Sequence, residues 1–208
     1  MTEAIVNFVA LLGWRPENNQ EIFSLSELVE AFDYHHISKS PAVFDMVKLK
    51  WMNGEYMKAM DFDKFFEMAK PYIEKVITKD IDLKKIAEMV KTRIEVFPDI
   101  KDQIDFFEAV PEYDNDMYTH KKMKTNPEVS LKALQLARPA IAAIEDFTED
   151  NVKEVLMSLA AANEMKTGQM MWPVRIAAAG KAVTPGGAIE ICRILGKDET
   201  IRRLKLGL

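Results

Sequence analysis

The 208-residue chain is 48% hydrophobic and 29% charged, with a formal net charge of −5. This composition is typical of a soluble globular protein and can bury the core of one large domain or two small ones. No apolar run approaches the roughly 20 residues that cross a bilayer, and the start lacks the basic segment and cleavage site of a signal peptide. The acidic balance argues against a protein that coats nucleic acid non-specifically.

Positive charge is concentrated near the end of the chain. Residues 166–208 carry eight Lys or Arg residues and three Asp or Glu residues. This segment could form a basic surface that attracts phosphate, or a solvated helix surface without a partner. The single cysteine, Cys192, excludes an internal disulfide and fits a reducing, cytoplasmic location. We expect its thiol to be a small buried apolar group.

The first half of the chain has helical periodicity throughout. Residues 3–12 predict a helix that Gly13 ends, because glycine tolerates positive φ at helix ends. A capping box from Ser24 to Glu27 predicts a second helix, whose expected buried face comprises Leu25, Leu28, Val29 and Phe32. Further helices are expected after Asp45, after Asp61 or Asp63, from Asp82 to about Val96, and from Pro98 to about Phe107.

The second half continues the helical pattern after a break. Residues 111–125 are rich in Pro, Asp, Asn, His and Lys and predict a surface connection. Asn126 followed by Pro127 predicts a helix start, since proline suits the first helical position. Thr148 opens the next predicted helix, which we expect Gly168 to end. Two or three short helices follow in 170–206, with breaks at Gly180, Pro185–Gly187 and Gly196.

Together these patterns predict an all-α fold, a helical bundle or cage of about 9–11 helices, with a possible boundary near 111–126. No motif for covalent chemistry is found. One Cys and three His do not form a zinc-binding pattern, and the adjacent His35 and His36 cannot share one helix face. The sequence also lacks a phosphate-binding glycine loop and a nucleophile elbow.

A polar cluster near the end is the candidate binding site. Arg175 follows Trp172, and the turn Thr184–Gly187 comes about ten residues later. A guanidinium can hydrogen-bond the edge of a base or stack on its face. A threonine hydroxyl beside Pro-Gly-Gly backbone can closely approach an unstacked base of an RNA loop. The residues alone leave open the alternative that Arg175 is a surface arginine at the start of a helix.

Three long stretches of the sequence resemble one family. They are residues 10–14 (ALLGW) with 21–28 (EIFSLSEL) and 38–45 (SKSPAVFD), then 48–56 (KLKWMNGEY), then 168–177 (GQMMWPVRIA) with 184–191 (TPGGAIEI) and 195–200 (LGKDET). All are similar to bacterial glutamyl-tRNA synthetases, in the same order and with suitable spacing. The resemblance covers essentially the whole chain and is far more specific than any short motif.

The family comprises class I aminoacyl-tRNA synthetases, which join L-glutamate to tRNA(Glu) using ATP and Mg²⁺ in an amino-terminal catalytic domain. The resemblance implies that this chain lacks that domain's signature motifs, is inactive alone, holds no cofactor, and belongs to the helical anticodon-binding region. It implies tRNA(Glu) as the partner, a monomer, and no membrane association. Residues 1–75 would end the stem-contact region, with 76–125 and 126–208 as two anticodon-binding subdomains.

The resemblance also implies roles for individual residues. The family's late arginine, which contacts anticodon bases, matches Arg175. Its Thr-Pro turn matches Thr184 and Pro185, with Gly187 beside the same pocket. The basic end of the chain would then add phosphate attraction without sequence information.

A second family arginine, on an earlier helix, reads the last anticodon base and helps to reject tRNA for glutamine. It matches Arg93, in a stretch that departs from many relatives. If the match holds, the enzyme discriminates between the two tRNAs. The alternative is an exposed helix arginine that supports Glu88 or Glu95.

Two other functions remain open from the sequence. One is a helical scaffold that binds protein, with its 13 methionines as adaptable contact surface. The other is a standalone tRNA-binding paralogue without a catalytic half.

Overall fold

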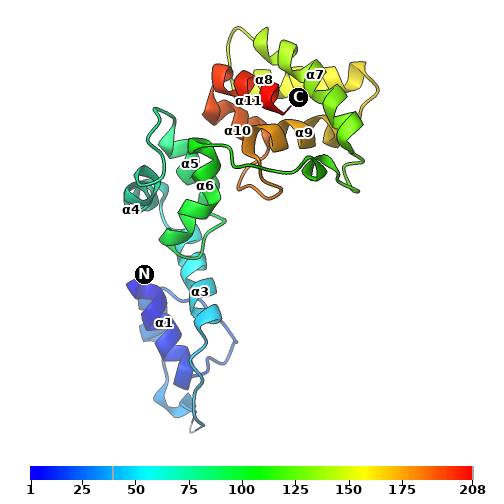
Figure 1. The fold of residues 1–208 in the computed structure, drawn as a ribbon. Coiled ribbons are helices and arrows are strands. Elements are labelled where there is room, and N and C mark those ends of the chain that lie inside the picture. The colour runs from blue at the N-terminus through cyan, green and yellow to red at the C-terminus, as the bar shows by residue number, and fades with distance from the viewer. Residues whose placement is uncertain (39, 208) are drawn as a thin grey trace.

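The computed structural model describes residues 1–38 and 40–207 and consists of helices joined by loops (Figure 1). The α-helices are α1 (Thr2–Gly13), α2 (Leu25–Ala31), α3 (Met46–Ala59), α4 (Phe62–Glu74), α5 (Leu83–Val90), α6 (Ile100–Glu108), α7 (Pro127–Ala142), α8 (Glu149–Ala162), α9 (Thr167–Ala179), α10 (Ala188–Leu195) and α11 (Lys197–Leu206). Three short 3₁₀ helices are η1 (Tyr34–His36), η2 (Phe97–Asp99) and η3 (Asn115–Tyr118). Within the described ranges, β-type pairing is limited to two isolated bridges, Trp14 with Ile37 and His120 with Thr125. The predicted all-α fold is therefore confirmed.

Local capping explains where most helices begin. The predicted capping box is present, because the Glu27 amide donates to Ser24 Oγ at 3.2 Å and the Ser24 amide donates to the Glu27 carboxylate at 2.7 Å. At the position left open by the sequence, Asp61 rather than Asp63 caps α4. Each such cap contributes about 1 kcal/mol. The other predicted caps also accept hydrogen bonds from amides of the first turn: Asp45, Asp82, Asn126 and Thr148.

The predicted end of the helix after Asp82 is wrong. Helix α5 stops at Val90 rather than near Val96, and the Arg93 amide donates to the Val90 carbonyl at 2.8 Å in a turn. A tertiary contact competes with the helix here, since Asn53 of α3 donates to the Glu95 carbonyl at 2.6 Å. Arg93 therefore lies in a turn after α5 and not on a helix.

The predicted role of Gly168 is also wrong. Helix α8 already ends at Ala162, and Glu164 adopts the left-handed conformation, with φ of 56°, before α9 begins. Gly168 lies instead in the first turn of α9. A Cβ atom at this position would come within 2.7 Å of Met123 Sδ, so the glycine permits close packing rather than ending a helix.

The expected apolar face of α2 is mostly exposed. Leu28 is buried, but Leu25, Val29 and Phe32 are 63%, 74% and 44% exposed. Leu28 belongs to the small core that this region forms with Trp14 and Phe23, and the half-exposed Phe32 ring lies 5.5 Å from the Trp14 ring. The periodicity correctly predicts a helix but not what covers it.

The buried side chains form three clusters that succeed one another along the molecule (Figure 1). The small first cluster lies beside α1 and α2, and α3 leads from it to the second. The second cluster contains the inner faces of α4, α5 and α6 and also the facing ends of α9 and α10. The third contains buried residues of α7–α11 together with Tyr118 of η3. Helices α9 and α10 thus belong to both larger cores and connect them.

One buried arginine joins these two cores. The side chain of Arg203, on α11, is 0% exposed. Its Nη1 donates to the carbonyls of Phe106 at 2.7 Å and Ala178 at 2.6 Å, and its Nη2 donates to that of Phe107 at 3.0 Å. Its Nε donates to the Glu199 carboxylate at 2.7 Å. One guanidinium thereby satisfies carbonyls at the ends of both α6 and α9.

Replacing Arg203 with Ala should lower the free energy of unfolding by about 3–5 kcal/mol, because it leaves several buried acceptors unpaired. Urea unfolding followed by circular dichroism measures this change. The matched control is Arg202→Ala, which removes an exposed arginine that binds the same Glu199 and should cost less than about 1 kcal/mol. Equal losses in the two variants would contradict the connecting role of Arg203.

The same ion cluster predicts a dependence of stability on pH. Hydrogen bonds from Arg202 and then Arg203 lower the pKa of Glu199 from 4.5 to about 2. Because the pKa is depressed in the folded state, this stabilisation is present above pH 4.5 and is lost as the pH falls from 4.5 to about 2. Glu199→Gln should reduce the acid-induced loss of stability in that window, measured by urea unfolding at a series of pH values. Glu128→Gln, which changes an exposed carboxylate on α7, should leave the profile unchanged.

Candidate nucleic-acid interface

The candidate site is built on the loop of residues 181–187, which joins α9 to α10 and is called here the α9–α10 loop. Gly180 ends α9 with a φ of 63°, a conformation that favours glycine. Lys181 Nζ donates to the Asp102 carbonyl at 2.9 Å and pairs with the Asp105 carboxylate. At the other end, the Gly187 amide donates to the Glu190 carboxylate at 2.9 Å and starts α10. Both ends of the loop are therefore fixed.

Arg175 projects from α9 and holds the middle of this loop. Its Nη2 donates to the Ala182 carbonyl at 2.8 Å, and its guanidinium lies 4.6 Å from the centre of the Trp172 ring. Its Nε is buried and has no partner among the described residues. Burial lowers the pKa of Arg175 from its ordinary value, although the group stays charged at neutral pH. Arg175 thus supports the loop through Nη2, and any donor for a ligand lies at the partly exposed end of its guanidinium rather than at the buried Nε.

Thr184 and Pro185 shape the loop from inside. Thr184 is buried, and its hydroxyl donates to the Gly186 carbonyl at 2.7 Å. Pro185 is buried beside it. The Thr184 proton is therefore used within the turn, so this residue offers a ligand only its acceptor lone pairs.

Arg93 meets the far side of the same loop. A cleft of about 340 Å³ is lined by Arg93 and Thr92 after α5 and by Pro185 and Gly186 of the loop. Arg93 is exposed and makes no ion pair with any residue in the described ranges, Glu88 and Glu95 included. Arg175, Thr184 and Gly187 do not line this cleft. The two predicted arginines therefore meet different parts of the loop: Arg175 binds it at the Ala182 carbonyl, and Arg93 shares a cleft with Pro185 and Gly186.

The Arg93 cleft is rich in carboxylates. Besides Arg93 it is lined by Lys85 and by Glu88, Glu149 and Glu190. Lys85 Nζ lies 3.2 Å from the Glu88 carboxylate and 3.9 Å from that of Glu149, and the hydrogen bond to Glu88 is the main cause of its raised pKa. Three acidic and two basic side chains repel a phosphate but can bind a neutral group that offers both donors and acceptors.

The acidic lining of this cleft and the aromatic support of Arg175 cannot be read from the sequence. Glu149 is recognisable there only as the first residue of a helix. Trp172 Nε1 donates to the Met117 carbonyl at 2.9 Å, and the Trp172 ring lies 4.1 Å from the His120 ring. These partners are about 50 residues away in the sequence, so no local pattern indicates them.

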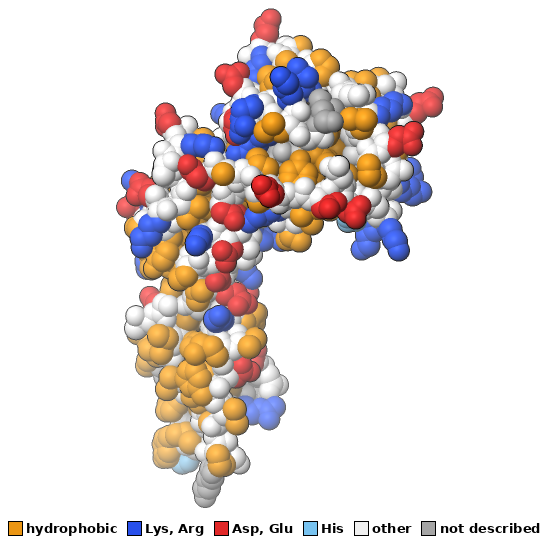
Figure 2. All heavy atoms as spheres, in the orientation of Figure 1, with side chains coloured by type: hydrophobic (Ala, Val, Ile, Leu, Met, Phe, Trp, Pro, Cys, Tyr) orange, Lys and Arg blue, Asp and Glu red, His pale blue; other side chains and the backbone are white. Residues whose placement is uncertain are grey.

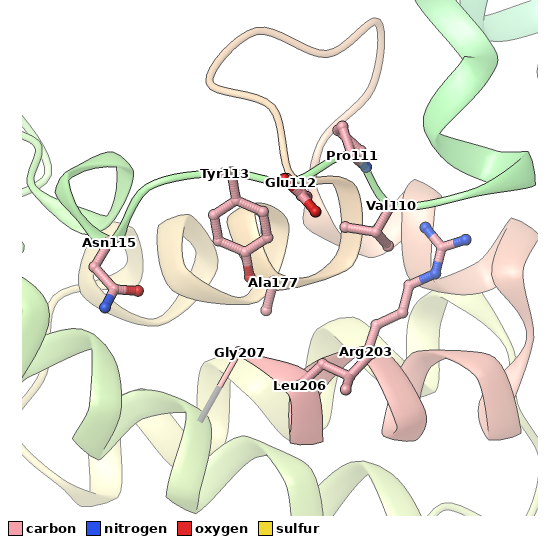
Figure 3. A pocket seen from close by; sticks show the side chains of 9 residues that line it. All are labelled: Val110, Pro111, Glu112, Tyr113, Asn115, Ala177, Arg203, Leu206 and Gly207. Carbon is pink, nitrogen blue, oxygen red and sulfur yellow. The ribbon is translucent and has the colours of Figure 1, made fainter.

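A larger cavity of about 650 Å³ lies beneath the segment that follows α6 (Figure 3). Arg203 reaches it from α11, but the donors of its guanidinium already bind backbone carbonyls and Glu199. None of the predicted site residues lines this cavity. Its lining residues are Val110, Pro111, Glu112, Tyr113, Asn115, Ala177, Arg203, Leu206 and Gly207.

Neither a metal site nor a membrane-spanning helix is found in the part of the chain that the structure describes. In residues 1–38 and 40–207, no group of three or more His, Cys, Asp or Glu side chains is placed to hold a metal ion. No helix in these ranges is both long and apolar enough to cross a bilayer. Cys192 is buried, as expected, and burial raises the pKa of its thiol to about 12, so it stays protonated.

Replacing Arg175 with Ala should release the α9–α10 loop, because it removes the hydrogen bond to the Ala182 carbonyl. Hydrogen exchange of amides in 181–187 should accelerate, while exchange in α7 and α8 should not change. The control Arg193→Ala removes an exposed arginine of α10 that does not line the Arg93 cleft. Unchanged exchange in the loop of Arg175→Ala would contradict its supporting role.

Comparison with known proteins supports the resemblance along the whole chain. The chain is 58% identical to the glutamate–tRNA ligase of Lachnoclostridium phytofermentans and 53% identical to that of Clostridium botulinum, over 208 residues in each case. All of the chain is covered, but it spans only 42% and 43% of the lengths of these relatives. A crystal structure of a glutamate tRNA ligase from Elizabethkingia meningosepticum, in complex with its amino acid, matches with a TM-score of 0.83 and 31% identity. That match covers 99% of this chain and 40% of the other.

Two family models divide the chain between them. Residues 1–51 match the model described as "tRNA synthetases class I (E and Q), catalytic domain". Residues 64–208, well over half of the chain, match the model described as "Anticodon binding domain". The chain therefore belongs to the anticodon-binding-domain family, in the form carried by glutamate–tRNA ligases.

Proposed function

We propose that this chain reads the anticodon of tRNA(Glu) as part of a glutamate–tRNA ligase. The full-length enzyme would attach L-glutamate to tRNA(Glu) using ATP. Support comes from the family, from the relatives, and from two arginines that meet one loop. The chain spans less than half of the relatives' length, so ligase activity belongs to the proposal for the whole protein.

The observation that carries the proposal is the arrangement around the α9–α10 loop. Arg175 binds the loop at the Ala182 carbonyl, whereas Arg93 shares a cleft with Pro185 and Gly186. RNA loops are read by splaying bases into separate pockets, where side chains bind their edges and faces. A fixed loop that meets two arginines at different positions can hold two such bases.

The Arg93 cleft suits the last base of the glutamate anticodon, a cytosine. Cytosine presents one exocyclic amine and two acceptors. Arg93 can donate to the acceptors, and a carboxylate such as Glu149 or Glu190 can accept from the amine. Uracil offers an acceptor in place of the amine and would meet a carboxylate unfavourably. The same cleft would discriminate against the glutamine anticodon. The last base of that anticodon is a purine, which is larger than the cytosine that the cleft fits.

The division into residues 1–75, 76–125 and 126–208 remains part of this proposal. Exposed apolar side chains in the first unit support its contact with further protein, since Val29, Val43 and Val47 are 74%, 84% and 76% exposed. They lie in the part that matches a class I catalytic domain. In the intact ligase, that domain would cover them.

ATP and Mg²⁺ would act in the catalytic domain of the full-length ligase rather than on the residues described above. We further propose a monomer that acts in the cytoplasm and has no membrane association. The relatives give no support to the two alternatives, a helical protein-binding scaffold or a standalone tRNA-binding paralogue.

Titration of the chain with an anticodon stem-loop of tRNA(Glu) tests the proposal. Loops with the last anticodon base changed from C to U or G should bind less tightly, by about 1–3 kcal/mol, which corresponds to roughly 5- to 150-fold. Arg93→Ala should remove the preference at the last base only. Arg175→Ala should weaken preference elsewhere in the anticodon, and Arg193→Ala should leave every preference intact. Fluorescence anisotropy of labelled stem-loops measures each affinity.

Equal binding of all stem-loops would contradict anticodon reading by this site. Absence of binding by a folded chain would show that it does not act alone. Charging assays with the intact ligase carrying the same arginine changes then decide between a wrong site and a requirement for the catalytic domain.

A further inference from the structure

The turn of residues 120–125, called here the lysine turn, concentrates positive charge on a rigid support. Lys121, Lys122 and Lys124 are all exposed. The backbone of His120 and Thr125 closes the turn through two hydrogen bonds of 3.2 Å. Lys124 adopts a left-handed conformation, with φ of 57°, and its amide donates to the Lys121 carbonyl. The three lysines therefore project from a closed turn rather than from a free loop.

Contacts with the start of α9 add a fourth lysine. Gln169 Nε2 donates to the Lys124 carbonyl at 3.1 Å, and the Lys166 amide donates to Gln169 Oε1 at 2.8 Å. One glutamine side chain thus ties the backbones of Lys124 and Lys166 together. Met123 also packs against Gly168, where a side chain would collide with it. The lysine turn and Lys166 form one local unit.

This unit lies one aromatic ring away from Arg175. His120, the first residue of the lysine turn, has its ring 4.1 Å from that of Trp172, and the same Trp172 ring supports the Arg175 guanidinium at 4.6 Å. The Met123 amide donates to His120 Nδ1, so the histidine is fixed to the turn. The lysines are consequently held next to the predicted base-reading arginine.

The charge of these four lysines is not neutralised within the molecule. Throughout the described ranges none of them takes part in an ion pair, whereas other lysines pair with carboxylates, for example Lys48, Lys85 and Lys181. The whole chain carries a net charge of −5, so a group of four exposed lysines without ion pairs stands out against its overall charge. In Figure 2, blue side chains project from the lower right edge of the upper part, the side on which α9 begins in Figure 1.

We propose that the lysine turn and Lys166 bind the sugar-phosphate backbone of the RNA strand whose bases reach Arg175. This inference rests on the proposed function and assigns a separate surface to it. Exposed, unpaired ammonium groups bind phosphates without reading sequence, and such contacts set the position of the strand. A phosphate cannot favourably occupy the Arg93 cleft with its three carboxylates, so base reading and backbone binding fall to different surfaces.

The triple variant Lys121→Gln, Lys122→Gln, Lys124→Gln tests the inference on the 208-residue chain, with the stem-loops used above. Affinity for all stem-loops should fall by a similar factor, about tenfold or more at low salt. The slope of log K against log salt should become shallower by up to about 2, since each phosphate of a single strand that is no longer neutralised removes about 0.7. The preference for the glutamate anticodon should remain.

A matched control removes the same charge elsewhere. Lys64, Lys101 and Lys153 are exposed on α4, α6 and α8 and take part in no ion pair of the described residues. Changing these three to Gln should alter affinity and salt dependence much less. Because all six lysines are exposed, both variants should keep the melting temperature of the parent.

The outcomes separate this inference from the function on which it rests. Unchanged affinity and salt slope in the lysine-turn variant, with the anticodon preference intact, would overturn the inference. That result would favour an acidic protein as the partner of these lysines. Equal losses in the two triple variants would also overturn it, since only overall charge would matter. If the parent chain binds all stem-loops with equal affinity, the proposed function fails and this inference fails with it. If it binds none, the same two triple variants are compared in the intact ligase with tRNA(Glu), where an unchanged affinity and salt slope in the lysine-turn variant would overturn the inference.

Discussion

The connection between the two larger cores depends on the buried guanidinium of Arg203. Helices leave their last carbonyls without partners, and an arginine is suited to several of them because its donors diverge from one rigid plane. Arg203 donates hydrogen bonds to carbonyls at the ends of α6 and α9. The negative end of each helix dipole also favours a cation there. Glu199 balances the charge, so the buried cation has a partner. The two larger cores are thereby fixed to each other.

Helix α9 transmits this constraint to the candidate site. Its last turn is held by Arg203, its middle carries Trp172 and Arg175, and its first turn is tied to the lysine turn by Gln169. The α9–α10 loop that follows is fixed to α6 through Lys181. Arg175, the α9–α10 loop and the lysine turn are thus attached to one helix that a buried charge holds in place, whereas Arg93 meets the loop from the turn after α5. Such support from regular structure is what a precise binding site requires.

Local sequence patterns predict the starts of helices well, because capping depends on side chains within three residues of the helix. Asp45, Asp82 and Asn126 illustrate this. Helix ends and buried faces are predicted less well because distant residues decide them. Asn53 binds the Glu95 carbonyl beyond the end of α5, and Met123 occupies the space that a side chain at position 168 would need. The periodicity of α2 predicts a helix with an apolar face. It does not reveal that this face is mostly exposed in the described residues.

The site can be predicted only in part from the sequence, for the same reason. Arg175, Thr184 and Arg93 can be named through resemblance, but their surroundings combine segments that are far apart in the chain. The structure adds a difference in charge that no motif contains: carboxylates beside Arg93, and unpaired lysines beside His120. Bases need directional donors and acceptors, whereas phosphates need positive charge. An acidic cleft at the α9–α10 loop and a basic turn beside the Trp172 ring suit these two demands, and the proposed division between them would allow an acidic chain to bind RNA.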